Sequence, residues 1–138
     1  MAGFGWHAET AVHVLRLVLA GILDRYPRLR LIIGHMGETL PVMMARCDQT
    51  LPQVQTHLTR SISQTLRDQV YLTTSGIFTR PPLEAALATF GLDRILYSVD
   101  YPYATNAQGQ AFLNGLQLPP ADVEKLAYGN ADRLLRLQ

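Results

Sequence analysis

The sequence predicts an α/β fold, with about three parallel strands and flanking helices. Three short apolar runs, residues 29–33, 70–76 and 94–99, alternate with stretches that have the periodicity of helices. The first run, LRLII, does not alternate polar with apolar residues, which is typical of a strand buried on both faces. Strands that alternate with helices along the chain favour a parallel sheet.

Composition and charge narrow the class of protein. The 138 residues are enough for one domain with its own core, so we expect residues 1–138 to form a single domain. A formal net charge of +1 gives no electrostatic reason to expect nucleic acid or a membrane surface as a partner. The longest apolar segment, 12–23, contains His13 and Arg16 and is too short to span a bilayer. The single cysteine, Cys47, excludes an intramolecular disulfide and indicates a reducing, cytoplasmic location.

The N-terminal third of the chain predicts a loop, a helix, a strand and a second helix. Residues 1–8 are rich in glycine and aromatic side chains and indicate a loop. A helical pattern follows over 9–26, and Pro27 ends it. The strand 29–33 comes next, and glycines separate it from a helix predicted over 38–50.

The remainder of the chain repeats this alternation. Residues 52–68 are polar and weakly patterned, which indicates a loop with room for a short helix. Between the second and third strands, Pro81 and Pro82 open a helix that extends to about Phe90. Beyond the third strand, helices are predicted to begin near Asp122 and at Asn130.

Polar side chains follow the predicted strands at their carboxyl ends. His35 and Glu38 follow the first strand, Ser75 ends the second, and Asp100 follows the third. In a β/α barrel, the carboxyl ends of all strands face the same mouth, where ligands bind. The shared location of these residues therefore predicts a functional site.

Each of three residues has a functional and a structural interpretation. His35 can transfer a proton near neutral pH or bind a metal, or it can be a hydrogen-bonded structural histidine. Glu38 can orient His35 or hold a water, or it can be an acidic residue favoured by the dipole of a helix N-terminus. Asp100 follows an apolar strand, where a carboxylate is costly unless it is paired or metal-bound, but it also fits a turn before Tyr-Pro.

The other histidines and the cysteine give weaker signals. His7 lies beside Trp6 in the predicted loop, and the sequence gives it no role. His13 belongs to a polar stripe on the first helix, and His57 lies in a polar loop. Cys47 is expected to be a small packed residue. The sequence has no glycine-rich phosphate loop, no serine-centred elbow and no cysteine-pair metal motif.

Four longer stretches are GWHAETAVHVLRLVLAGILDRYPRLRLIIGHMGETLP, YLTTSG, DRILYSVDYPY and GNADRLL. Together they resemble the C-terminal part of the amidohydrolase-2 family, which includes aminocarboxymuconate-semialdehyde decarboxylase and resorcylate decarboxylase relatives. The pair GHMGE and SVDYP, in this order and at this distance, is the most specific part. The resemblance implies a metal-dependent (β/α)8 barrel, of which this chain would be the C-terminal part with the sixth, seventh and eighth strands.

The resemblance also implies roles for the site residues. Asp100 matches the family's metal-ligating aspartate after the last strand. His35 matches the catalytic histidine after the sixth strand, and Glu38 matches its acidic partner. These matches imply a divalent metal, zinc or manganese. They imply hydrolysis or non-oxidative decarboxylation of a small aromatic or unsaturated carboxylic acid.

The sequence departs from the family in one respect. The family's His-x-His or Glu-x-His ligand pair and the histidine after its fifth strand have no match here, and a full barrel takes about 250 residues. We therefore expect a fragment, a truncated reading frame or part of a split enzyme. An open barrel piece exposes strand edges, which predicts a homodimer or higher oligomer. The alternatives are a catalytically inactive, self-associating fragment without metal, and a small doubly wound binding module.

Overall fold

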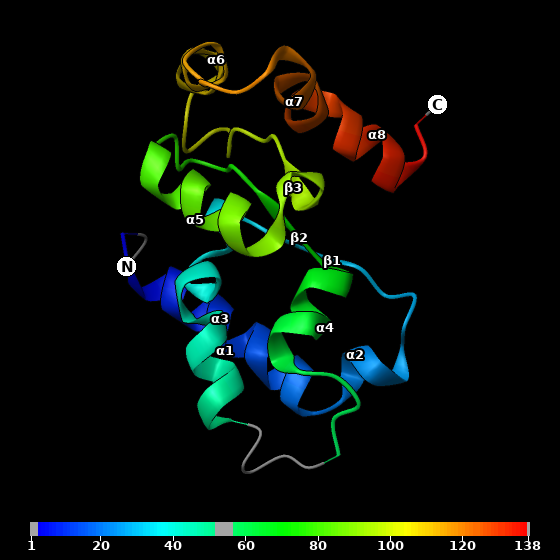
Figure 1. Ribbon diagram of the computed structural model, residues 1–138. Coiled ribbons are helices and arrows are strands. Elements are labelled where there is room, and N and C mark those ends of the chain that lie inside the picture. Colours follow the sequence, from blue (N-terminus) through cyan, green and yellow to red (C-terminus); the bar gives the residue numbers. More distant parts are fainter. Residues whose placement is uncertain (1–2, 52–56, 138) are drawn as a thin grey trace.

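The computed structural model describes residues 3–51 and 57–137, and a parallel three-stranded sheet lies at its centre (Figure 1). The strands are β1 (Leu31–Ile33), β2 (Val70–Thr73) and β3 (Ile95–Leu96), in the order β1-β2-β3. Leu31 lies opposite Val70, and Leu72 lies opposite Ile95, so adjacent strands run in the same direction. The predicted α/β class with three parallel strands is confirmed, although each strand is shorter than its apolar run.

The N-terminal segment contains two helices where the sequence predicted a loop and one helix. Helix α1 spans Gly5–Leu19, so the predicted loop is wrong at residues 5–8. The predicted continuation of this helix to Tyr26 is also wrong. Gly21 has a φ of 70°, a left-handed conformation that ends the first helix, and the short helix α2 (Ile22–Arg25) follows.

Helices α3 (Leu40–Thr50), α4 (Ile62–Gln69) and α5 (Arg80–Phe90) pack against one another and cover one face of the sheet (Figure 1). The short helix allowed for within 52–68 is α4, and residues 52–56 of that segment lie outside the described residues. Ser61 begins α4, because its side-chain oxygen accepts a hydrogen bond from the N–H of Gln64 at 3.1 Å.

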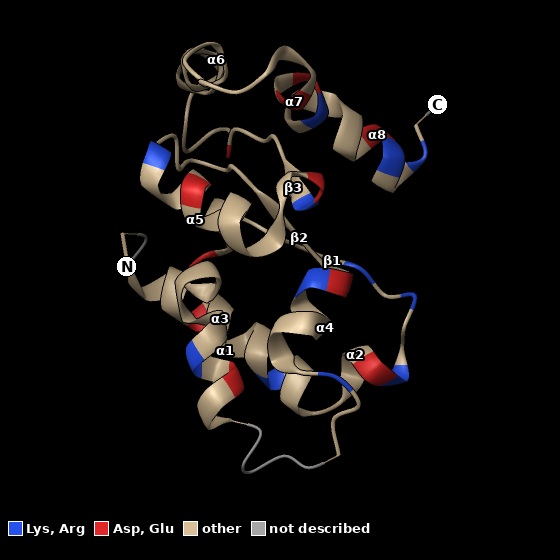
Figure 2. Cartoon of the chain, viewed as in Figure 1, with Lys and Arg blue, Asp and Glu red and all other residues tan. Residues whose placement is uncertain are grey.

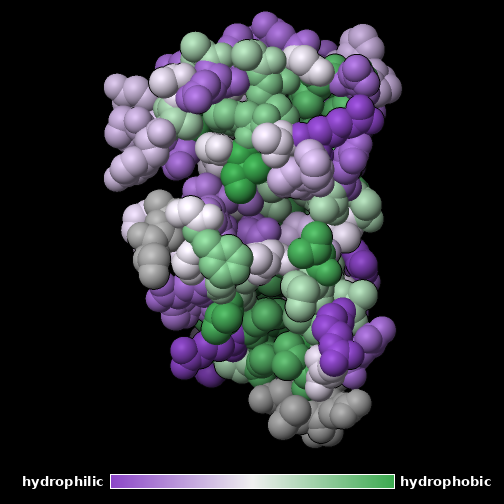
Figure 3. Space-filling model, turned by 90° about the vertical axis from the view of Figure 1, so that its left-hand side faces the viewer, coloured by the Kyte–Doolittle hydropathy of each residue, from purple (hydrophilic) through white to green (hydrophobic). Residues whose placement is uncertain are grey.

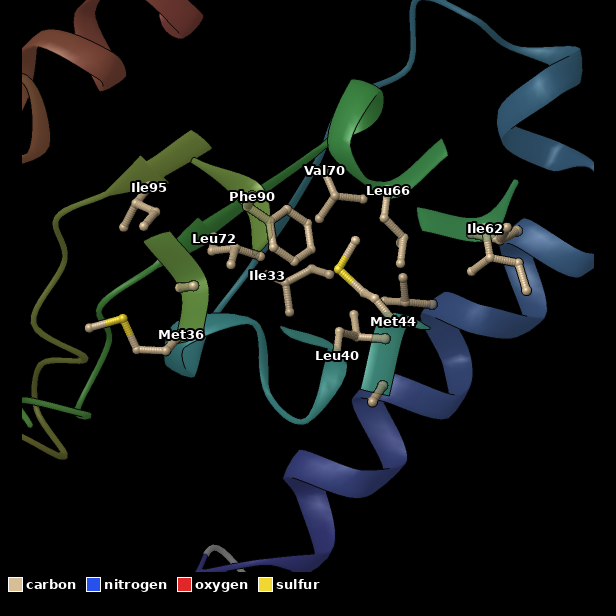
Figure 4. Close-up of a cluster of buried hydrophobic side chains, with 14 of the residues drawn as sticks. Ile33, Met36, Leu40, Met44, Ile62, Leu66, Val70, Leu72, Phe90 and Ile95 are labelled. Atoms are coloured by element: carbon tan, nitrogen blue, oxygen red, sulfur yellow. The ribbon is translucent and has the colours of Figure 1, made fainter. Parts of the chain in front are cut away.

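The hydrophobic core lies between these helices and the sheet (Figure 4). Ile33 and Leu72 point from the strands toward Met44 and Phe90 of the helices, and all four are buried. Full burial of one such side chain contributes about 1.5–3 kcal/mol to folding. Ile32, on the opposite face of β1, is 49% exposed. The prediction that this strand is buried on both faces is therefore wrong.

The C-terminal segment adds three helices beyond β3. They are α6 (Asn106–Asn114), α7 (Pro120–Glu124) and α8 (Asn130–Leu135), with a π-helical turn, η4, over Lys125–Gly129. The helix predicted to start near Asp122 and the helix predicted at Asn130 are both present. The buried side-chain amide of Asn130 donates hydrogen bonds to the carbonyls of Leu92 and Ile95 at 2.9 and 2.8 Å, which fixes α8 against β3.

A polar network fixes the chain where it enters β1. The Arg60 guanidinium donates to Asp24 at 2.8 Å and to the Gln69 side chain at 2.6 Å, and Gln69 donates to the carbonyl of Leu29 at 3.1 Å. Burial alone would raise the pKa of the Asp24 carboxyl. Hydrogen bonds from Thr59 and Arg60 outweigh that effect and lower the pKa.

Charged residues lie on the helices and loops, and the three strands carry none (Figure 2). Within residues 3–51 and 57–137, no helix is long and apolar enough to cross a membrane.

Candidate active site

The segment after β1 holds two of the predicted site residues in an unusual backbone conformation. A short 3₁₀ turn, η1 (His35–Gly37), follows the strand directly. His35 has a φ of 49° and Glu38 a φ of 61°, both in the left-handed region that costs a non-glycine residue about 1–3 kcal/mol. Glu38 therefore lies outside helix α3, which begins at Leu40. The predicted helix start at Glu38 is wrong, and so is the interpretation of Glu38 as an ordinary first-turn acid.

Glu38 is a buried carboxylate that lies between two imidazole rings. Its side chain is 3% exposed. Oε1 lies 2.9 Å from Nδ1 of His35, and Oε2 forms a short hydrogen bond with Nδ1 of His7. The two rings meet edge to face, with centroids 4.8 Å apart. Both carboxylate oxygens thus have a nitrogen partner, as a buried carboxylate requires.

Asp100 reaches the same place from the end of β3. It has a φ of 73°, and its carbonyl accepts hydrogen bonds from the N–H groups of Tyr103 and Ala104 at 2.8 and 3.1 Å. Its Oδ2 lies 3.5 Å from Nε2 of His35, and its side chain is 33% exposed. Gly76 allows this approach, since a Cβ at that position would lie 3.0 Å from Oδ2.

A row of hydroxyl groups continues the site at the ends of β2 and β3. The Ser75 hydroxyl lies 2.6 Å from that of Thr73 and 2.5 Å from that of Ser98. Gly34 lies close by, because a Cβ there would be 3.8 Å from Cβ of Ser75. These hydroxyls provide donors and acceptors between the two strand ends that carry the ionisable residues.

The imidazole of His35 lies between two hydrogen-bond acceptors. Nδ1 faces the Glu38 carboxylate, and Nε2 faces the Asp100 carboxylate. A neutral imidazole has one N–H and can donate to only one of them. One N–H at Nδ1 can therefore serve Glu38, and Nε2 and Oδ2 of Asp100, which lie 3.5 Å apart, can both face a cation. An imidazole nitrogen and a carboxylate oxygen are ligands that zinc and manganese accept, so these residues fit part of a metal site.

The structure brings His35, Glu38 and Asp100 together, and it adds His7, to which the sequence gave no role. His7 was missed because residues 5–8 were assigned to a loop, and no short spacing links position 7 to position 38. Ligand atoms of His7, His35 and Glu38 lie within 4.8 Å of one another. His13 points to solvent from the same helix, 3.6 Å from Glu9.

The remaining candidates lie outside this cluster. His57 is exposed, as predicted. Cys47 is buried in α3, and burial, with the charge of Asp48 as the smaller cause, raises the pKa of its thiol. A thiol with a raised pKa is a poor nucleophile, which agrees with its assignment to packing.

Comparison with known proteins identifies the family. A family model described as amidohydrolase, of the amidohydrolase-2 type, matches residues 1–137. The decarboxylase orsB of Emericella nidulans is 38% identical over 98% of this chain and 43% of its own length. The gamma-resorcylate decarboxylase of Polaromonas sp. is 39% identical over 94% of this chain and 41% of its own length.

Solved structures agree with the sequence relatives. A putative amidohydrolase from Staphylococcus aureus superimposes with a TM-score of 0.92 at 40% identity, over 99% of this chain and 44% of that one. The 2,6-dihydroxybenzoate decarboxylase from Rhizobium gives a TM-score of 0.90 at 37% identity, over 97% and 43%.

The chain thus spans less than half the length of these relatives. Its three parallel strands correspond to part of their barrel, which confirms the predicted partial barrel. The alternative of a small doubly wound module does not agree with these matches. The chain belongs to the amidohydrolase-2 family.

Proposed function

We propose that this chain supplies the His35, Glu38 and Asp100 part of a metal-dependent active site that decarboxylates a small aromatic carboxylic acid. The observation that carries the proposal is the convergence of these three side chains from two strand ends, each on a left-handed backbone. Strained conformations of this kind cluster at functional sites. The names of the relatives support decarboxylation over hydrolysis, and one solved relative holds 2,6-dihydroxybenzoate.

The metal would be a divalent ion held by Asp100. The related decarboxylase structure from Polaromonas holds manganese, which supports manganese over zinc. Such an ion, when bound, supplies a Lewis acid that stabilises negative charge on the substrate. A catalytic metal usually has about three protein ligands. Asp100 and His35 provide at most two, so we propose that further ligands come from a barrel portion that this chain does not match.

His35 would handle the proton of the reaction. When the bond between the ring carbon and the carboxyl group breaks, CO₂ leaves. The electron pair of that bond stays on the ring carbon, which then takes up a proton. The imidazolium form of His35 would deliver that proton from Nε2, while Nδ1–H stays bonded to Glu38. Glu38 would stabilise the imidazolium and keep the ring in this orientation.

A turnover measurement tests the role of His35. Release of CO₂ from 2,6-dihydroxybenzoate would be measured with added manganese, for a complete barrel that includes this segment and for its His35→Asn variant. We expect turnover to fall by about 10²-fold or more, as for loss of a general acid. His13→Asn is the control, because His13 points to solvent away from the cluster. Unchanged turnover in His35→Asn would remove His35 from the mechanism.

A second candidate is a self-associating, metal-free protein, which the uncovered sheet face favours. Ile32 is half exposed on that face, and apolar side chains are also exposed on the face that Figure 3 shows in space-filling form. We propose that a second copy of the chain covers the open face in a homodimer. Light scattering should give twice the chain mass, and Ile32→Lys should shift it toward monomer. A stable monomer of the unmodified chain would contradict self-association, and bound manganese would contradict a metal-free protein.

A further inference from the structure

His7 is the member of the cluster that the proposed reaction does not use. It lies in the first turn of α1, and its side chain is 22% exposed. Its Nδ1 is bonded to Oε2 of Glu38, whereas Nδ1 of His35 is bonded to Oε1. The two imidazoles therefore hold opposite oxygens of one carboxylate.

This arrangement restricts the orientation of the Glu38 carboxylate. The terminal torsion of a glutamate side chain is broad, so one hydrogen bond leaves the carboxylate plane poorly defined. A second donor on the other oxygen fixes the plane. It also provides a partner for the second oxygen of this side chain, which is 3% exposed, because a buried acceptor left unpaired is costly. His7 thus determines where Oε1 lies relative to His35.

The orientation of Oε1 in turn selects the tautomer of His35. The hydrogen bond made by one ring nitrogen decides which nitrogen carries the proton. With Oε1 fixed 2.9 Å from Nδ1, neutral His35 carries its proton on Nδ1. Its Nε2 then carries no proton and is an acceptor on the side of Asp100, 3.5 Å from Oδ2.

We infer that His7 is a positioning residue that fixes Glu38 so that His35 is held in its Nδ1–H form with Nε2 directed at Asp100. The inference deepens the proposed function and rests on it for its catalytic meaning. The tautomer of His35 can nevertheless be measured without turnover. A purely structural His7, which only anchored the first turn of α1 to the loop after β1, would leave that tautomer unchanged.

The test is nitrogen-15 NMR of the imidazole rings in the 138-residue chain, at a pH where the histidines are neutral. In the unmodified chain, His7 and His35 should both be Nδ1–H tautomers. A predominant Nε2–H form of either one would overturn the inference, and this result needs no variant. The measurement therefore remains decisive even where a substitution disturbs folding.

Three variants separate positioning from anchoring. In His7→Leu the ratio of Nδ1–H to Nε2–H at His35 should fall by about tenfold, the size expected for loss of one well-oriented hydrogen bond to a charged group. His7→Asn should restore the ratio, because its side-chain amide N–H can replace the Nδ1–H donor. His13→Leu, which removes an exposed histidine from the same helix, should leave the ratio unchanged.

The outcomes distinguish this inference from the proposed function. An unchanged His35 tautomer in His7→Leu would overturn the positioning role, whatever the turnover. Loss of the Nδ1–H form in His7→Leu and its return in His7→Asn would support it, even in a chain that releases no CO₂. In a complete barrel that includes this segment, absence of turnover together with a normal His35 tautomer would count against the proposed function alone.

Discussion

The segments after β1 and β3 each present a carboxylate to His35, but the two carboxylates differ in burial and in their neighbours. Glu38, after β1, is 3% exposed and has an imidazole on each oxygen. Asp100, after β3, is 33% exposed, and within residues 3–51 and 57–137 its one neighbour of opposite potential charge is His35, at 3.5 Å. A carboxylate whose oxygens are both occupied can orient a neighbour, whereas one with free lone pairs can accept a ligand. This difference supports our proposal that the β1 end positions His35 and that the β3 end binds a ligand.

A positive φ does not explain this difference, because both residues have one. Glu38 and Asp100 have φ values of 61° and 73°, and each conformation costs about 1–3 kcal/mol. Their surroundings differ instead. The β1 end lies under the first turn of α1, which brings His7 onto Glu38. Asp100 is followed along the chain by Tyr101 and Tyr103, whose side chains are exposed.

Substitutions of the two carboxylates should differ most in their effect on manganese affinity. Asp100→Asn removes a proposed ligand and should weaken binding by about 10²-fold or more, whereas Glu38→Gln acts through His35 and should weaken it by about tenfold. Equilibrium dialysis of the unmodified protein and both variants measures this. Equal losses in the two variants would mean that the ends do not have separate roles.

Folding stability should show the reverse order. Glu38→Gln replaces a buried acceptor oxygen that faces an imidazole N–H, and it should lower the free energy of unfolding by about 2 kcal/mol. Asp100→Asn changes a partly exposed group and should alter it by less than about 0.5 kcal/mol. Urea unfolding followed by circular dichroism provides both values. A larger loss in Asp100→Asn would reverse the comparison.

Much of the fold could be predicted because hydrophobic periodicity is a local property. The apolar runs around Ile33, Leu72 and Ile95 indicated the three parallel strands, and the prolines in the first turn of α5 marked its start. The break at Gly21 was missed, because the apolar pattern continues through it. Burial of β1 on both faces was also predicted wrongly, since a sequence pattern does not show which covering segments are present.

The candidate site, like the fold, could be predicted from the sequence only in part. Its location followed from the position of His35, Glu38 and Asp100 after strands, which is a sequence property. The pairing of Glu38 with His7 is a contact over 31 residues that depends on where α1 packs, so no local pattern could reveal it. The left-handed backbone at His35 and Glu38 is equally invisible, because neither residue type is selected by that conformation in the way that glycine is.

Two glycine substitutions are expected to have the smallest effects, and they test how rigidly Asp100 is held at the β3 end. Gly76 and Gly21 have φ values of 66° and 70°, so alanine at either position should cost about 1 kcal/mol in backbone strain alone. At Gly76 the added Cβ would also lie 3.0 Å from Oδ2 of Asp100, whereas at Gly21 the nearest described atoms would be those of the His57 ring, at 3.5 Å. Because Asp100 is partly exposed, its side chain can move away. We therefore expect equal losses of stability in Gly76→Ala and Gly21→Ala by urea unfolding, with a severalfold loss of manganese affinity in Gly76→Ala alone. A much larger loss of stability in Gly76→Ala would show that Asp100 is held as rigidly as Glu38, and the β3 end would then be as complete as the β1 end.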